Sequence, residues 1–431
     1  MMKRENVNFI INPIHNWFNS GMQEQMDNRH LLKTNNFPMP PLLSINKVYK
    51  WRNYKYLSVH HYDSVEKEEN KRVLNNDLEQ LEQLEPYDNH EVQWVGGSFE
   101  WPCATTKSMF KNSGRYISKN VIATRAAIFN DDAFLALPRF RPGIPATLAR
   151  VSLKDRNCQA NLYAFPCWSV QEEGTLKALQ NVVDLFLDPQ DILWVLDTGV
   201  IHTLEESVRM SPPKVVAFNV KTGKLVKTVE LDGLTTPSSR LQYVVADYSP
   251  DGRVFIYVSD AATRAILVYD VISGRGYRFV LPKIVTMSSS RRDVLYLALI
   301  RHADGSTCLM FTYLSSSHLF SIKTEYLRNG LTNGKIQDIG MKPKRLVILG
   351  TDNGNALFFR YEGEGIVQRW DTNTPFQPEN FQKVYNGATC SLATHVIPDY
   401  KRNGMRVLES NFPDYIEGTV GCGANQALNI M

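Results

Sequence analysis

The chain has 431 residues, of which 43% are hydrophobic and 21% are charged, and its formal net charge at pH 7 is +4. Lys and Arg are spread along the chain rather than gathered in one block, so the sequence does not predict a nucleic-acid-binding surface. No apolar run reaches the roughly 18 residues typical of a membrane-spanning helix, so we expect no membrane span.

The N-terminal region has little regular patterning. Residues 1–44 are rich in Asn, Met and Pro, which predicts a disordered or unprocessed arm, and their start lacks the apolar core of a signal peptide. The alternating stretch VYKWRNYKYLSV, at 48–59, predicts a strand. Residues 63–91 are polar and acidic; leucines at helical spacing allow a short helix, but the polarity favours a solvated insertion.

The stretch ALPRFRPGIPATLARV, at 136–151, places three prolines and a glycine between two short apolar runs. Proline has no N–H for a strand ladder and restricts the residue before it. We therefore expect a constrained connector between two strands. Its Arg139 and Arg141 suit an anionic ligand or, equally, salt bridges to a neighbouring part of the fold.

Two later segments resemble one another, NVVDLFLDPQDILWVLDTG at 181–199 and QYVVADYSPDGRVFIYVSDAA at 242–262. Aligning Pro189 with Pro250 puts the two copies 61 residues apart. Each copy has two apolar strands around a proline-containing turn, followed by two more strands joined at a Thr-Gly or Ser-Gly hairpin. This pattern predicts a meander of four antiparallel strands.

Weaker copies of this unit bring the number to about six between residues 120 and 415. Such repetition predicts an all-β fold, a six-bladed β-propeller of four-stranded antiparallel blades. We place it at 45–420, with 421–431 as a flexible C-terminal tail. The strand at 48–59 is expected to complete the last blade, because joining the two chain ends protects the sheet edges.

In a propeller the innermost strands line the axis, where polar side chains from different blades converge. Asn181 and Gln242 hold this position in the two clearest units and are candidate ligand-binding residues; alternatively, their amides satisfy backbone groups. Acidic residues recur after the second strand of a unit, and their repetition favours a structural role in the following turn. They are Asp197, Asp260, Asp352 and Glu409.

Aromatic residues near the strand ends form a second group of candidates. They could enclose an aromatic amine through cation–π contacts, or simply pack between blades. They are Phe140, Trp194, Tyr243 and Tyr313. His202 and His318 are candidate acid–base residues, although a surface histidine is the simpler interpretation of each, and no nucleophile elbow is present. The six cysteines have no C-x-x-C pair, so no zinc site is predicted; buried thiols and one or two disulfides both remain open.

Five separated stretches together resemble the yellow / major royal jelly protein family of insects over roughly residues 46–415. They occur in the family's order, and they are VYKWRNYKYL, LPRFRPGIPATLARV, DILWVLDTG with PPKVVAFNVKTGKLV, VFIYVSDAATRAILVYDV, and FTYLSSSHLFSIKTEYLRNG. The resemblance implies a six-bladed propeller in which Arg139–Leu148 links two strands of the first blade and Gly143 and Pro145 shape the turn. Ser211 and Arg369 stand where the family commonly has cysteines, so its usual disulfide pairing does not transfer.

The resemblance also implies a function. It predicts a secreted protein of insect cuticle pigmentation and the melanin pathway that binds a catecholamine-like or other small amine ligand in the propeller channel. The alternative is an enzyme that converts dopachrome by tautomerisation. A calcium-dependent hydrolase of the lactonase type is a third interpretation, because such propellers hold calcium at the axis through Asn and acidic side chains. We otherwise expect no cofactor and no metal site.

Overall fold

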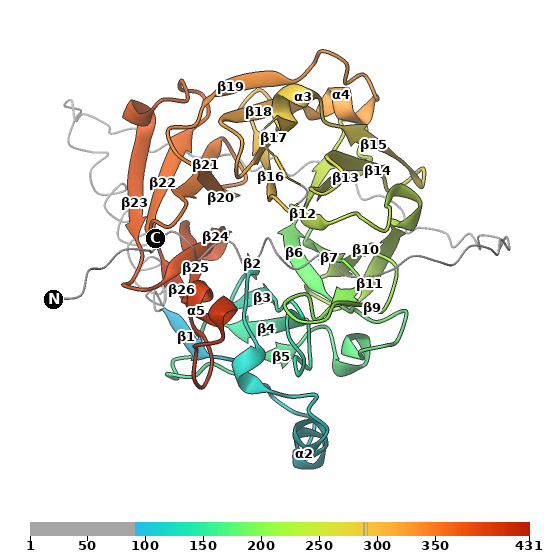
Figure 1. The fold of residues 1–431 in the computed structure, drawn as a ribbon, viewed down its shortest axis with the longest axis vertical. Coiled ribbons are helices and arrows are strands. Elements are labelled where there is room, and N and C mark those ends of the chain that lie inside the picture. Colours follow the sequence, from blue (N-terminus) through green and yellow to red (C-terminus); the bar gives the residue numbers. More distant parts are fainter. Residues whose placement is uncertain (1–90, 288, 291) are drawn as a thin grey trace, which may run out of the picture. The chain divides into compact units, whose positions relative to one another are not determined.

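The computed structural model describes residues 91–287, 289, 290 and 292–431. Six four-stranded antiparallel sheets surround a common axis, so the predicted six-bladed propeller is confirmed (Figure 1). The predicted arm at 1–44 and strand at 48–59 lie outside the described residues, as does nearly all of the insertion at 63–91.

The first three blades follow one another along the chain, each with its first strand nearest the axis (Figure 1). Blade 1 contains β2 (Arg125–Phe129), β3 (Asp132–Ala136), β4 (Leu148–Ser152) and β5 (Tyr163–Ala164). Blade 2 contains β6 (Val182–Leu187), β7 (Ile192–Asp197), β10 (Lys214–Asn219) and β11 (Leu225–Glu230). Blade 3 contains β12 (Leu241–Tyr248), β13 (Val254–Asp260), β14 (Ala265–Asp270) and β15 (Arg275–Val280).

The remaining three blades complete the ring. Blade 4 contains β16 (Leu295–Arg301), β17 (Thr307–Tyr313), β18 (His318–Lys323) and β19 (Gln337–Met341). Blade 5 contains β20 (Leu346–Thr351), β21 (Ala356–Tyr361), β22 (Ile366–Asp371) and β23 (Phe381–Asn386). Blade 6 contains β24 (Leu392–Asp399), β25 (Gly404–Ser410), β26 (Asn425–Ile430) and β1 (Val92–Val95).

Short helices and a small sheet lie outside the six blades. The helices are α2 (Ala104–Asn112), α3 (Lys283–Thr286), α4 (Thr324–Arg328) and α5 (Phe412–Glu417). β8 (Val200–Ile201) and β9 (Val208–Arg209) form a separate two-stranded sheet. α2 buries none of its residues and projects from the ring (Figure 1).

Blade 6 is built from both ends of the described chain. β1 pairs with β26, with Val92 opposite Leu428. This corrects the expectation that 421–431 is a flexible tail, since Leu428 is fully buried and Asn425–Ile430 forms β26 between β25 and β1. In the described residues the last blade is completed by β1 at 92–95 rather than by the predicted strand at 48–59, which lies outside the described residues.

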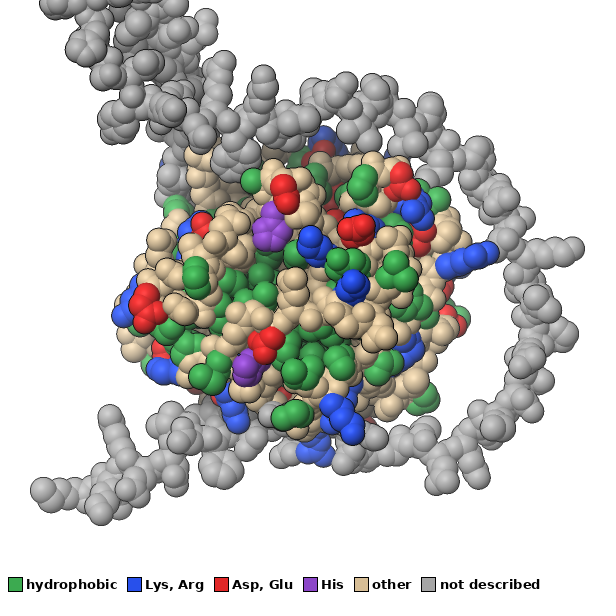
Figure 2. All heavy atoms as spheres, turned by 90° about the horizontal axis from the view of Figure 1, so that it is seen from above, with side chains coloured by type: hydrophobic (Ala, Val, Ile, Leu, Met, Phe, Trp, Pro, Cys, Tyr) green, Lys and Arg blue, Asp and Glu red, His purple; other side chains and the backbone are tan. Residues whose placement is uncertain are grey.

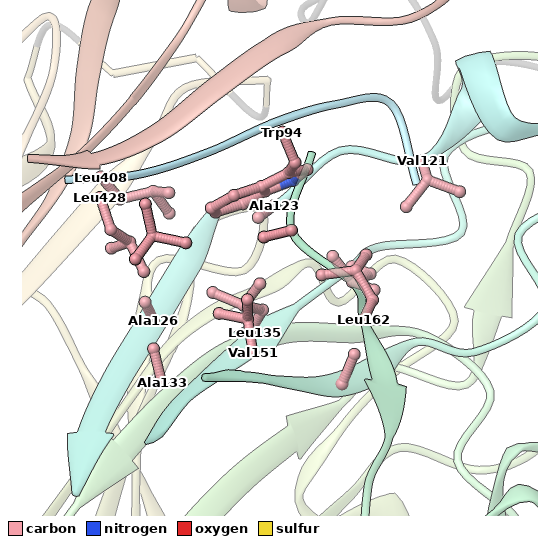
Figure 3. Close-up of a cluster of buried hydrophobic side chains, with 14 of the residues drawn as sticks. Trp94, Val121, Ala123, Ala126, Ala133, Leu135, Val151, Leu162, Leu408 and Leu428 are labelled. Carbon is pink, nitrogen blue, oxygen red and sulfur yellow. The ribbon is translucent and has the colours of Figure 1, made fainter. Parts of the chain in front are cut away.

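The seam between blades 6 and 1 is filled by apolar side chains (Figure 3). Trp94 of β1 and Leu408 and Leu428 of blade 6 pack there with Leu135 and Val151 of blade 1. Burying such side chains stabilises the fold by about 1.5–3 kcal/mol each relative to exposure. Apolar packing thus stabilises the junction of the two chain ends.

Candidate functional site

The innermost strands are irregular where they pass the axis. β6, β12, β20 and β24 each contain a shift in register against the second strand of their blade. Such bulges bend a strand and re-aim its side chains. Asp184, Tyr243 and His395 each lie in or directly beside one of these shifts.

Polar and aromatic side chains from the blades meet near these bulges, and we call this group the axial cluster. Its members are Arg125 of β2, Asp184 of β6, Tyr243 of β12, Tyr296 of β16, Arg360 of β21 and His395 of β24. The Arg125 Nε atom lies 3.5 Å from Asp184 Oδ1, and its guanidinium carbon lies 4.7 Å from the centre of the Tyr243 ring. The Tyr243 and Tyr296 rings are 5.3 Å apart.

Several of these side chains also join neighbouring blades. The sheets do not pair with one another, so backbone groups at the inner strands need other partners. Asp184 Oδ2 accepts the Val244 N–H of the next blade at 2.7 Å, and His395 Nδ1 accepts the Ala126 N–H at 3.1 Å. Each of these side chains keeps a second polar atom, Asp184 Oδ1 or His395 Nε2, for other contacts.

Burial controls the charge of the axial cluster. Burial raises the pKa of Asp184 to about 6, although the nearby Arg125 favours its ionised form. Burial, and secondarily the charge of Arg125, lower the pKa of His395 well below its usual range, so this ring is neutral at pH 7. Its Nδ1 accepts a hydrogen bond, which places its proton on Nε2. Arg125 therefore faces the Asp184 carboxylate, while Arg360 lies near the hydroxyl groups of Tyr243 and Tyr296.

Of the ligand-binding residues predicted from sequence, one belongs to the axial cluster. Tyr243 belongs to the axial cluster, whereas the neighbouring Gln242 uses its Oε1 to accept the Leu295 N–H of the next blade at 2.9 Å. Asn181 is buried; its Oδ1 accepts the Arg139 N–H, and its Nδ2 donates to the Val200 carbonyl. The amides of Gln242 and Asn181 thus satisfy backbone groups, as the alternative interpretation supposed.

Arg139 lies 1% exposed within the connector between β3 and β4. Its five N–H groups donate to five backbone carbonyls at 2.5–3.3 Å, those of Ile144, Pro145, Gln171, Leu179 and Gln180. No N–H group of this side chain remains for an anionic ligand. Gly143 turns the same connector at φ 80°, where a Cβ would lie 2.6 Å from the Ile117 side chain.

The other predicted residues lie away from the axial cluster. Phe140 packs against Phe412 and Tyr415. Tyr313 is fully buried and donates its hydroxyl hydrogen to the Ala261 carbonyl at 2.9 Å. His318 pairs with Asp338 at 2.8 Å in blade 4.

His202 is a loop residue with φ 54° that donates its backbone N–H to the Arg139 carbonyl. The recurring acids serve the backbone too: Asp197 accepts the N–H groups of Gln180 and Asn181, and Asp260 accepts that of Arg240. All six cysteines are free thiols, and Cys308 alone among them is buried.

Five members of the axial cluster carry no recognisable sequence motif, and they are Arg125, Asp184, Tyr296, Arg360 and His395. The available signal is an ionisable residue inside an otherwise apolar inner strand, such as Asp184 in VVDLFL or His395 in LATHVIP. A register shift of one residue reverses which side chains face the axis. The bulges therefore conceal the alignment of these positions between repeats.

A hollow that is separate from the axial cluster lies between blades 4 and 5. It has a volume of about 590 Å³, and none of its lining residues belongs to the axial cluster. The axial cluster remains the better candidate for the main site, because it brings together one side chain from each of the six blades, several of them with shifted pKa values.

Within the described residues, no group of three or more His, Cys, Asp or Glu side chains is arranged to hold a metal ion. None of the helices in the described part of the chain has the length and apolar character needed to cross a membrane.

A family model described as Major royal jelly protein matches residues 180–428, which covers blades 2–5 and most of blade 6. The chain belongs to this family. Protein yellow of Drosophila melanogaster is 24% identical over 314 residues, which cover 66% of this chain and 58% of that protein. Protein yellow of Drosophila subobscura is 24% identical over 315 residues, covering 67% of this family member and 55% of the relative.

Solved structures give weaker likenesses to this family member. Regucalcin from Agrobacterium tumefaciens, a calcium-binding protein, matches with a TM-score of 0.43 and 16% identity, covering 73% of this chain and 92% of that one. An auxiliary nutrient binding protein from Bacteroides thetaiotaomicron matches with a TM-score of 0.42 and 8% identity, covering 79% of this chain and 77% of that one. TM-scores this low do not indicate a shared function.

Proposed function

We propose that this protein acts outside the cell in insect pigmentation, and that its axial cluster binds a small catechol-derived ligand. The observation that carries this proposal is the pair of rings, Tyr243 and Tyr296, set beside Arg125, Asp184 and a neutral His395. Aromatic rings at 5.3 Å offer flat surfaces for a catechol ring. The polar groups beside them offer hydrogen bonds to its hydroxyls.

The charges of the axial cluster indicate whether the catechol ligand carries an amine or an acid group. A catecholamine would need a carboxylate for its ammonium, and Asp184, which already faces Arg125, is the single carboxylate of the axial cluster. The guanidinium groups of Arg125 and Arg360 are better partners for an anion. The Arg360 Nε and Nη1 donate to the Ala393 and Tyr361 carbonyls, and its remaining N–H groups can donate to a carboxylate. We therefore favour a catechol with an acid group over the amine expected from sequence.

Calorimetry with three matched catechols tests this proposal: dopamine, 3,4-dihydroxyphenylalanine and 3,4-dihydroxyphenylacetate. We expect the acetate to bind about tenfold more tightly than dopamine at pH 7, since one lost charge-assisted hydrogen bond amounts to about 1.5–3 kcal/mol. Arg360→Met should remove this preference. Tyr313→Phe, whose hydroxyl serves the backbone elsewhere, is the matched control.

The pH dependence gives a second measure. Between pH 7 and pH 5 the Asp184 carboxyl takes up a proton, because its pKa is about 6, and the negative charge beside the ligand disappears. Affinity for the acetate should therefore rise as the pH falls, and it should stay flat in Asp184→Asn. Tighter binding of dopamine would restore the amine interpretation, and binding unaffected by Tyr243→Ala would remove the axial cluster as the site.

Dopachrome conversion is the second candidate function, favoured by a specific observation. The neutral imidazole of His395 lies close enough to Arg125 for its pKa to be lowered by that charge. The Nε2–H of this neutral imidazole can donate a hydrogen bond to a developing enolate, and a guanidinium can stabilise its charge. Loss of dopachrome absorbance faster than the spontaneous rate, abolished in His395→Leu but retained in His318→Leu, would support catalysis. A rate equal to the spontaneous one would leave only the binding function.

A further inference from the structure

The hollow between blades 4 and 5, which we call the seam groove, lies outside the proposed function. Its volume of about 590 Å³ is within the range of small-molecule sites. Its walls come from β17, β18, β19 and β22 and from the loop at 372–376. Figure 2 views the molecule from above Figure 1, where β19, α3 and α4 lie, and shows apolar side chains between scattered charged ones.

The floor of the seam groove is aromatic and apolar. Trp370 and Phe376 lie edge to face with their rings 4.8 Å apart, and Met310 packs in the same cluster. The Trp370 Nε1 donates to the Thr374 carbonyl at 3.2 Å. The indole has therefore used its one donor, and its ring offers only apolar surface to an occupant.

One wall carries polar groups without partners. Ser321 is 3% exposed and lines the seam groove, yet within the described residues its hydroxyl makes no hydrogen bond. Ser321 lies opposite Met310 on one side and Gln337 on the other, so these three form a row across blade 4. The Gln337 amide likewise has no hydrogen bond in the described structure. Because the Ser321 hydroxyl lines the seam groove and has no partner among the described residues, a ligand in the groove can form a hydrogen bond with it.

The ionisable residues that line the seam groove are His302, Cys308 and Asp338, and none of the lining residues is a lysine or an arginine. Asp338 at its rim is paired with His318 at 2.8 Å. Burial raises the pKa of the Cys308 thiol, which keeps this side chain neutral at physiological pH. An anionic ligand would lose its hydration here without gaining a counter-charge, because no lysine or arginine lines the seam groove.

We propose that the seam groove binds an uncharged, ring-containing small molecule whose hydroxyl pairs with Ser321 while its rings pack against Trp370 and Phe376. The volume, the aromatic floor and the unpaired hydroxyl each point to such an occupant. The site is independent of the axial cluster, so it stands whether or not a catechol binds there.

Titration of the full chain with 2-naphthol tests the proposal, with naphthalene-2-carboxylate and 2-naphthylmethylamine as charged probes of the same ring system. We expect 2-naphthol to bind about tenfold more tightly than either charged probe, because only these two must surrender ionic hydration. Ser321→Ala should weaken 2-naphthol binding about fivefold through loss of one hydrogen bond. Ser273→Ala, at an exposed serine in blade 3, is the matched control and should change nothing.

A second variant and a second readout keep the test decisive. Gln337→Trp places a bulky ring at an exposed position of β19, where it should cap the seam groove without disturbing the core, and binding should be lost. Hydrogen exchange of the wild-type chain with 2-naphthol should show protection in β19 and in 372–376. Equal affinity for the charged probes, unchanged binding in Gln337→Trp, or protection confined to the inner strands would each overturn the proposal.

Discussion

Two arginines of blade 1, Arg139 and Arg125, differ in role although both side chains are largely enclosed. All five N–H groups of Arg139 donate to backbone carbonyls, so this side chain ties the connector between β3 and β4 to the segment 171–180 that precedes β6. Arg125 donates to the Thr394 carbonyl and otherwise faces Asp184 and the Tyr243 ring. Arg139 therefore has a structural role, whereas Arg125 keeps N–H groups that can donate to a ligand.

Replacing Arg139 tests the structural role. Arg139→Met keeps much of the side-chain volume but leaves five carbonyls without donors, so we expect a loss of at least about 3 kcal/mol in the free energy of unfolding. Urea denaturation measures this loss. Arg275→Met, at an exposed position of β15, should change stability by no more than about 0.5 kcal/mol. Equal effects of the two substitutions would contradict the assigned role of Arg139.

At the scale of elements, the bulged inner strands determine how closely neighbouring blades approach. Gly350 follows the register shift of β20 and has φ 153°, a conformation that favours glycine. A Cβ at this position would lie 2.3 Å from the Val396 carbonyl oxygen of β24. Blades 5 and 6 can therefore meet at the axis only because residue 350 has no side chain.

Gly350→Ala should separate β20 from β24 or distort both strands. Overpacking of this kind costs about 1–3 kcal/mol, so the melting temperature should fall by several degrees. Gly233→Ala is the control, because nothing lies within 4 Å of a Cβ at that position. A melting temperature unchanged in Gly350→Ala, measured by circular dichroism, would show that the inner strands can move apart freely.

At the scale of the whole molecule, the ring depends on blade 6. β26 lies between β25 and β1, so it is the element through which the two ends of the described chain are joined. An ion pair between Asp131 of blade 1 and Arg402 of blade 6, at 2.9 Å, joins the same two blades as the apolar packing around Trp94. Ring closure therefore combines strand pairing, apolar burial and charge.

Removing residues 425–431 deletes β26 and tests this closure. β1 then loses its partner and the buried surface around Trp94 opens, so we expect loss of the cooperative thermal transition rather than a small shift. Near-ultraviolet circular dichroism and thermal unfolding measure the change. Removing only Met431, which lies beyond β26, should leave one cooperative transition. A truncated chain that still unfolds cooperatively would show that five blades suffice.

The sequence by itself determined the repeating strands, the number of blades and the constrained connector around Arg139, because alternating apolar residues and turn residues are local signals. It also indicated closure by joining the chain ends, with the strand at 48–59 as the predicted N-terminal partner. In the described residues, β1 at 92–95 and β26 form that junction. Only the tertiary structure decided which polar side chains meet. Asp184, His395 and Arg360 come together because bulges shift the inner strands by single residues and because distant blades close into a ring. Neither effect leaves a periodic trace in the sequence.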